Sequence, residues 1–278
     1  MVLKRVVVAH FSPTGGTKKV ATILHKAFQE QSKVAGSFKT LPFNFLSPKL
    51  RAKRTPTFGP EDLLIFAYPV FFGRMPWAFE NWPELKGNGA RAIVVNVYGN
   101  RAIEDAERET MAFLSKHDFK ILGKIDAIAE HSQERTLAHN RPDANDEQVL
   151  SQSVHMILHT IAKIGWDNLK PYPFDAKTPL KAPGKAPSVP VVIKPESCDK
   201  CLRCVTACPC GIINKDTLAV SEEDMALCMG CRACMSACPD CNRGFSEQIT
   251  QAIAKRMAQI KAANLQPKPV EIALSDMA

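Results

Sequence analysis

The stretches CDKCLRCVTACP (residues 198–209) and CMGCRACMSACP (residues 228–239) repeat one spacing of cysteines and proline. Each reads C-x2-C-x2-C-x3-C-P, in which short gaps bring three thiolates into one turn and the proline prevents that turn from continuing as a helix. Two zinc sites or a disulfide framework are alternative uses of paired cysteines. Neither explains why a third cysteine and a proline recur together, so the repeat favours two iron-sulfur clusters.

This spacing resembles that of bacterial-type ferredoxins, in which the fourth cysteine of each run ligates the cluster of the other run. The resemblance implies a small α+β ferredoxin-like domain over residues 191–245 that holds two [4Fe-4S] clusters. Cys210 and Cys241 exceed the eight ligands, and either serve as alternative ligands or redox-sensitive thiols or are packed thiols, the interpretation that we favour. The implied ligands are Cys198, Cys201, Cys204 and Cys238 for one cluster, and Cys228, Cys231, Cys234 and Cys208 for the other.

Composition indicates a globular protein. The 278 residues, of which 45% are hydrophobic, are enough for one ordinary domain and a smaller one. No apolar run approaches the ~20 residues of a membrane span, and the first residues lack the long apolar region of a signal peptide. We therefore expect a cytoplasmic protein without a membrane span, whose cysteines face a reducing interior.

The formal net charge of +8 lies outside the cysteine-rich segment, because residues 188–245 carry six Lys or Arg against seven Asp or Glu. Basic residues gather at RAKR, residues 51–54, and at lysines between residues 170 and 185. A docking surface for an acidic partner or for nucleic acid is one interpretation of these groups. We favour a solvated loop and a solvated linker, and we expect no nucleic-acid partner.

The N-terminal half alternates apolar runs with amphipathic segments. KRVVVAH, residues 4–10, predicts a buried strand that passes through the turn FSPTGGT into a helix with one apolar face. Further strands are predicted at residues 41–45, 62–68, 91–97 and 119–129. Five strands that alternate with helices imply an α/β fold with a doubly wound parallel sheet over residues 1–166.

Polar, glycine-containing loops follow the first, third and fourth strands, at the edge where such sheets bind ligands. The loop after the first strand offers hydroxyls and helix N-terminal N–H groups to a phosphate. It resembles the FMN phosphate loop of flavodoxins, S/T-x-T-G-x-T, with Gly16 where those proteins commonly have Asn. The resemblance assigns Ser12, Thr14, Gly15, Gly16 and Thr17 to the phosphate, and Pro69, Val70, Phe71, Phe72, Gly73, Arg74, Tyr98, Gly99, Asn100 and Arg101 to the flavin ring.

Several side chains near these loops have two interpretations. Trp77 and the aromatic residues of the loops either stack on the flavin or belong to the core and rim. Arg74 and Arg101 either face the N1 and O2 edge of the ring, where a cation stabilises reduced flavin, or remain solvated. His131 beside Glu130 either relays protons or forms an ordinary pair at a strand end, and we favour the ordinary pair.

The remaining segments connect and follow the two domains. Residues 167–190 hold six of the chain's 20 prolines and predict an extended, semi-stiff linker. In residues 246–278 we expect a C-terminal helix, whose apolar stripe must pack on the N-terminal domain or on a partner, and then a loose tail from Leu265.

The whole chain resembles the flavodoxin-ferredoxin fusion proteins of anaerobic bacteria and archaea, over residues 6–244. Besides the cysteines, FSPTGGTKKVA, PVFFGRMP, VYGNRAIEDA and EHSQERTLAHNRPD carry the resemblance. It implies an electron-transfer flavoprotein in which electrons pass between two clusters and FMN, with a redox protein as partner. Alternatives are an FMN-dependent reductase of a small substrate and a redox-sensing or docking subunit with an empty flavodoxin fold. The sequence leaves open whether the chain is an enzyme and whether it forms a homodimer.

Overall fold

The computed structural model describes residues 1–184, 186 and 188–275. Its larger domain is built on a sheet with the strand order β2-β1-β3-β4-β5-β8, in which the first five strands run parallel. The order 2-1-3-4-5 is that of flavodoxin-like doubly wound folds, which confirms the predicted fold class. The parallel strands are β1 (Arg5–His10), β2 (Lys39–Asn44), β3 (Asp62–Pro69), β4 (Arg91–Tyr98) and β5 (Lys120–Ile128).

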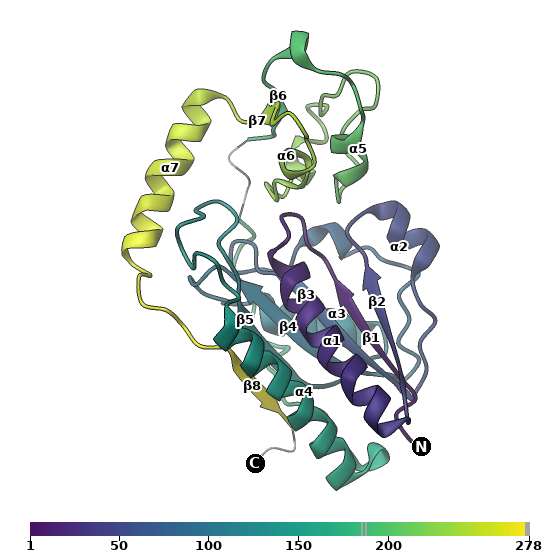
Figure 1. Ribbon diagram of the computed structural model, residues 1–278. Coiled ribbons are helices and arrows are strands. Elements are labelled where there is room, and N and C mark those ends of the chain that lie inside the picture. Colours follow the sequence, from purple (N-terminus) through teal and green to yellow (C-terminus); the bar gives the residue numbers. More distant parts are fainter. Residues whose placement is uncertain (185, 187, 276–278) are drawn as a thin grey trace.

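Helices cover both faces of this sheet (Figure 1). On one face, α1 (Gly16–Ala35) and α4 (Ala144–Ile164) pack side by side, and on the other lies α3 (Ala106–Lys116). Because both faces are covered, the central strands are continuous apolar runs without the alternation of a half-exposed strand. The sheet therefore separates two hydrophobic cores.

The C-terminal segment corrects the expected loose tail. After α7 (Glu247–Ala262), residues of β8 (Glu271–Leu274) pair antiparallel with β5, so the sheet has six strands. A Cβ atom at Gly123 would lie 2.2 Å from the Ala273 carbonyl oxygen, so glycine permits this close approach. Four residues, of which three have apolar side chains, give too short a pattern to identify an edge strand from the sequence. Residues 276–278 of the predicted tail lie outside the described residues.

The proline-rich segment runs extended along the larger domain and is bonded to it. The Arg108 guanidinium on α3 donates to the Pro179 carbonyl at 2.8 Å, and the Lys181 N–H donates to the Asp105 carboxylate at 2.7 Å. Nearer its start, Tyr172 packs against the hydrophobic core on the α3 face. The path of this segment is therefore fixed by side chains of the flavodoxin-like domain.

The smaller domain sits beyond the carboxyl ends of the parallel strands (Figure 1). Each cysteine run contributes one short helix, and both helices begin after a residue with left-handed backbone: Leu202 at φ 59° and Arg232 at φ 61°. The repeated sequence thus folds into a repeated local structure. Its elements are β6 (Val191–Val192), α5 (Arg203–Ala207), α6 (Ala233–Ser236) and β7 (Arg243–Gly244), with β6 antiparallel to β7.

Shorter helical segments complete the two domains. The seven-residue helix α2 (Pro48–Arg54) follows β2, and its Ser47 side chain accepts a hydrogen bond from Leu50 N–H as an N-cap. Single 3-10 turns are η1 (Trp77–Phe79), η2 (Trp166–Asn168), η3 (Pro195–Ser197) and η4 (Met225–Leu227).

Candidate functional site

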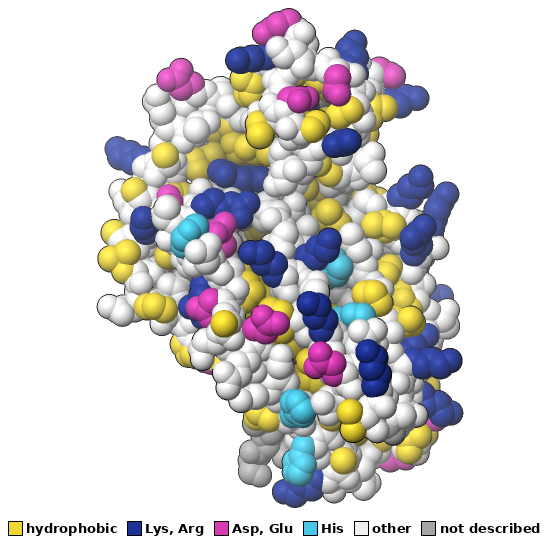
Figure 2. Space-filling model, in the orientation of Figure 1, with side chains coloured by type: hydrophobic (Ala, Val, Ile, Leu, Met, Phe, Trp, Pro, Cys, Tyr) yellow, Lys and Arg dark blue, Asp and Glu magenta, His cyan; other side chains and the backbone are white. Residues whose placement is uncertain are grey.

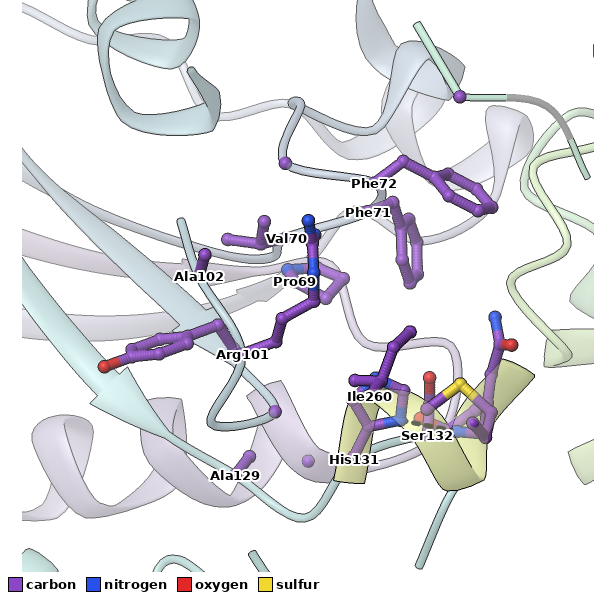
Figure 3. A pocket seen from close by; sticks show the side chains of 18 of the residues that line it. Pro69, Val70, Phe71, Phe72, Arg101, Ala102, Ala129, His131, Ser132 and Ile260 are labelled. Atoms are coloured by element: carbon purple, nitrogen blue, oxygen red, sulfur yellow. Dashed lines mark hydrogen bonds between the residues drawn. The ribbon is translucent and has the colours of Figure 1, made fainter. Parts of the chain in front are cut away.

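A cavity of about 650 Å³ opens at the carboxyl ends of the parallel strands (Figure 3). Loops after β1, β3, β4 and β5 line it, together with the proline-rich segment and α7. All but three of the residues that the sequence assigned to FMN lie on its surface. They are Ser12, Thr14, Gly16, Thr17, Pro69, Val70, Phe71, Phe72, Gly73, Tyr98, Gly99 and Arg101.

The loop between β1 and α1 is arranged for an anion. The N-cap residue of α1 is Gly15, which provides no side-chain cap, but the Lys18 N–H of the first turn donates to Ser12 Oγ at 2.9 Å. Gly15 does not line the cavity, but its φ of 96° makes the turn that starts the helix. A Cβ atom at Gly16 would lie 3.1 Å from Ala129 Cβ, so the asparagine common in flavodoxins would press on the β5 loop.

The loop after β3 presents aromatic side chains to the cavity. Phe71 and Ile260 of α7 project into it from opposite sides (Figure 3). Phe72 has a φ of 55°, and a Cβ atom at Gly184 would lie 2.4 Å from its ring, so the proline-rich segment rests directly on this phenylalanine. The cavity is therefore closed on this side by the linker.

Arg74 does not lie where a flavin-facing cation would. It is absent from the described cavity lining, and its guanidinium pairs with the buried carboxylate of Glu109 on α3, with Nε 2.7 Å from Oε2. The same carboxylate accepts the Met75 N–H at 2.8 Å, and Arg74 also donates to the Lys181 carbonyl. Its hydrogen bonds to Glu109 raise the pKa of Arg74. Arg74 thus fixes the loop and the linker to α3.

Asn100 also has a structural position. Its side chain is 2% exposed and donates to the carbonyls of Asn264 at 2.8 Å and Gln266 at 2.9 Å, while its oxygen accepts the Lys268 N–H at 2.9 Å. These contacts hold the segment between α7 and β8. They join positions more than 160 residues apart, and no local sequence pattern predicts such a contact.

Helix α7 forms a side of the cavity that the sequence did not assign. Ile253, Met257 and Ile260, spaced four and three residues apart, lie on one helical face and line the cavity. The apolar stripe predicted that this helix packs on something, but not what it covers. Arg256 and Gln259 border the cavity from the same helix, and both are exposed.

His131, after β5, lies on the cavity surface and accepts backbone hydrogen bonds through its ring. Its Nδ1 accepts N–H groups of Gln133 and Glu134, each at 3.2 Å, which places the ring proton on Nε2. Burial, with the charge of Arg232 as a lesser cause, lowers the pKa of His131 to about 4. Glu130 instead pairs with Arg135 at 2.7 Å, so the two neighbours form no His–Glu proton relay.

The eight cysteines of the two runs gather around two small cavities of the smaller domain. Of these eight, three cysteines of one run and the fourth of the other line each cavity, and Cys210 also lines one of them. The crossed ligation of two clusters stays a prediction. No three His, Cys, Asp or Glu side chains of the described residues converge on a single metal ion. In a cubane each cysteine binds its own iron, so the sulfurs need not converge. The outer cysteine set is Cys198, Cys201, Cys204 and Cys238, and the inner cysteine set is Cys208, Cys228, Cys231 and Cys234.

The two sets differ in their surroundings. In the inner set, three of the four cysteines are buried, and Cys231 packs with Met229 into the hydrophobic core on the α3 face of the larger domain. In the outer set none is buried, and Cys201 is exposed. The inner set therefore faces the flavodoxin-like domain and the outer set faces solvent.

Cys210 and Cys241 also differ from each other. Cys210 is half-buried at the cavity of the inner cysteine set, its Sγ lies 3.1 Å from the Leu227 carbonyl, and burial raises its pKa to about 12. Cys241 is exposed, so the expectation of a packed thiol does not hold there.

Two side chains attach the inner cysteine set to the larger domain. Arg51 is 6% exposed and donates to four carbonyls, including Ala78 at 2.8 Å and Pro209 at 2.9 Å. The Trp77 indole donates to the Leu227 carbonyl at 3.1 Å and does not line the large cavity in the described structure. The solvated interpretation of RAKR is thus wrong for Arg51.

The rest of that basic segment is solvated as expected. Lys53 and Arg54 are exposed, and basic side chains cover the surface over α2 (Figure 2). The same view shows a hollow beneath the smaller domain, beside α7, with apolar side chains at its back (Figure 2).

Comparison with known proteins agrees with this division of the chain. Residues 190–239 match the family model of the 4Fe-4S dicluster domain. The chain joins a flavodoxin-like domain to an iron-sulfur domain. A curated relative, the iron-sulfur subunit of arsenate respiratory reductase from Shewanella sp. (strain ANA-3), is 36% identical over 58 residues, which is 20% of this chain. The matched part spans only 25% of that relative.

Solved structures similar to the flavodoxin-like domain are distant in sequence. A flavodoxin from the domain Archaea is 11% identical, with 57% of this chain and 99% of that chain covered and a TM-score of 0.39. The flavodoxin of Streptococcus pneumoniae TIGR4 is 13% identical, with 56% and 98% covered and a TM-score of 0.38. The strand order of the sheet, rather than these likenesses, identifies the fold. No helix in the described part of the chain is long and apolar enough to cross a membrane.

Proposed function

We propose that the protein is an electron-transfer flavoprotein that carries two [4Fe-4S] clusters and one FMN and passes electrons between them. The observation that carries this proposal is the position of the inner cysteine set. Residues next to these cysteines pack into the core that also holds Val70 and Phe71 of the large cavity. A cluster on the inner set would therefore pack on the same apolar core as the β3 loop, which would also support a flavin in that cavity.

The residues of the large cavity suit FMN. The N-terminus of α1, with Ser12 and Thr17, would hold the phosphate. Phe71 and Tyr98 offer apolar surface to the ring, and Arg101 supplies a cation on the same side of the cavity as Val70 (Figure 3). His131 would donate from Nε2 without carrying charge near neutral pH. Bound FMN supplies the conversion between single electrons and electron pairs.

The order of the redox centres follows from burial. We infer that a partner redox protein exchanges electrons at the outer cysteine set, that the inner set relays them, and that the flavin cavity is the other end. Because iron-sulfur clusters are oxygen-labile and their cysteine ligands must stay reduced, we expect the protein in the reducing cytoplasm of an anaerobic cell. The direction of electron flow is set by the potentials and by the partner.

Anaerobic purification tests the proposal directly. We expect about eight iron and eight sulfide per chain from two cubanes, and about one FMN. An iron-loaded protein that neither retains nor rebinds FMN would favour the docking subunit. Zinc in place of iron and sulfide would contradict the cluster assignment.

A further inference from the structure

Helix α7 changes what can reach a flavin in the large cavity. In doubly wound folds the ligand crevice lies outside the carboxyl ends of the strands. Here Ile253, Met257 and Ile260 cover that crevice from one side, and Gly184 of the linker rests on Phe72 at another. A second protein would meet the chain's own helix before the flavin. A small molecule needs only the space that the cavity provides.

The border of this cavity is positively charged. Arg101 and Lys181 both pair with Glu104, which balances one of their charges. Glu130, the acidic residue in the cavity lining, is already bonded to Arg135. Arg256 of α7 has no hydrogen-bond or ion-pair partner among the described residues. An anionic ligand would therefore find an unpaired guanidinium at the edge of an apolar slot.

We propose that the flavin cavity admits a small, flat, anionic electron acceptor between α7 and the flavin ring, with Arg256 binding its anionic group. This proposal rests on the proposed function, and it favours the alternative in which the protein is an FMN-dependent reductase of a small substrate. The acceptor takes two electrons and two protons. The electrons enter singly from a one-electron donor protein at the outer cysteine set, and the protons come from water.

A pair of isosteric probes tests the site. 4-Nitrobenzoate and 4-nitrobenzamide differ by one charge, and a two-electron reduction converts each nitro group with two protons to a nitroso group and water. In oxidised holoprotein we expect 4-nitrobenzoate to perturb the flavin absorption saturably, and to bind at least tenfold more tightly than the amide. Arg256→Ala should weaken nitrobenzoate binding about tenfold. Lys255→Ala, which removes an exposed charge from the same helix outside the cavity lining, should leave it unchanged.

Each contrary result has its own meaning. Equal affinities for the two probes, or equal behaviour of the two variants, would overturn the anion site while FMN stays bound. FMN loss confined to Arg256→Ala would assign this arginine to the FMN phosphate and also overturn it. A wild-type protein without FMN would instead refute the proposed function itself.

A second inference rests on a different residue. Arg243, on β7, is 3% exposed and lines both the inner and the outer cysteine cavities. It donates to the Leu218 carbonyl through Nη1, while its Nε is buried without a partner in the described structure. Iron-sulfur reduction adds negative charge, which a nearby buried cation stabilises strongly because little solvent screens it.

We propose that Arg243 raises the reduction potentials of both clusters. Arg243→Gln should lower both potentials with iron content unchanged, and Arg243→Lys, which keeps the charge, should lower them less. Arg203→Gln removes an exposed cation of α5 and should shift neither, because solvent screens it. Redox titration followed by electron paramagnetic resonance measures the shifts. Unchanged potentials in iron-loaded Arg243→Gln would overturn the proposal, and if that variant does not assemble, unchanged potentials in iron-loaded Arg243→Met, which also removes the charge, would do so.

Discussion

The guanidinium of Arg51 donates a hydrogen bond of 2.9 Å to the carbonyl oxygen of Pro209, across the boundary between the two domains. Pro209 directly follows Cys208 of the inner cysteine set. The same guanidinium donates to the carbonyls of Phe45 and Leu46, just after β2, and to that of Ala78, so one side chain joins three segments. Burial lowers the pKa of Arg51, but an arginine remains charged at neutral pH.

Arg51→Ala should therefore destabilise the contact between the domains. Four carbonyls lose a charged donor, and we expect the free energy of unfolding to fall by about 2–4 kcal/mol, with partial loss of iron from the inner set. Anaerobic denaturant unfolding and iron analysis measure both effects. Arg54→Ala, an exposed position of the same helix, should stay within about 0.5 kcal/mol of wild type. Equal effects of the two variants would refute the role of Arg51.

Two neighbouring pairs of cysteines test the crossed arrangement. Cys208→Ser should remove the cluster associated with Cys228, Cys231 and Cys234, because it takes away the fourth ligand of that cavity. Cys210→Ser is the matched control and should keep about eight iron, since its thiol contacts the Leu227 carbonyl.

The same comparison applies to the outer set, with Cys238→Ser against the exposed Cys241→Ser. Iron content and the spectrum of the remaining cluster distinguish the variants. Loss of the cluster associated with Cys198, Cys201 and Cys204 in the Cys208→Ser variant would mean that all four cysteines of the first run bind one cluster. Crossed ligation would then be wrong.

Local patterns predicted the parts of this protein that depend on neighbours in sequence. Apolar runs such as KRVVVAH predicted the parallel strands, and the resemblance carried by the cysteine spacing implied the two groups of cysteines. The phosphate-type turn was also visible, because glycine at position 15 meets a local backbone requirement.

Residue roles that depend on distant contacts were not predictable in this way. Arg74, Asn100 and Arg51 look alike in the sequence, as polar residues in loops or basic segments. Their partners, Glu109, the segment after α7 and Pro209, are brought to them only by the packed fold. The position of α7 over the large cavity was not predicted for the same reason, since an apolar stripe shows that a helix packs but not on which surface.

Asn100→Ala should release the C-terminal segment. Three hydrogen bonds to residues 264–268 are lost, at a cost of about 1–3 kcal/mol, which corresponds to a roughly 5- to 150-fold rise in local opening. Hydrogen exchange should therefore quicken at the amides of β8 and at the β5 amides that pair with it. Asn145→Ala, at an exposed position of α4, is the control. Unchanged exchange in β8 would mean that strand pairing alone holds this segment.

His131 and His10 should make the protein less stable in mild acid. Burial lowers the pKa of each to about 4, below the 6.5 of an unfolded histidine, and Lys18 adds to the effect at His10. Between these values the unfolded chain binds more protons than the folded chain, so stability is complete above pH 6.5 and falls as the pH drops towards 4. Each histidine should cost about 2 kcal/mol between pH 7 and pH 5.

Denaturant unfolding under anaerobic conditions at pH 5, 6, 7 and 8 measures this dependence. His131→Gln and His10→Gln should each flatten the curve, because glutamine does not take up a proton. His155→Gln removes an exposed imidazole of α4 and should leave the curve as in wild type. A His131→Gln protein with the wild-type slope would show that the imidazole is protonated equally in the folded and unfolded chains. Its neutral Nε2–H could then not be the donor that faces the flavin cavity.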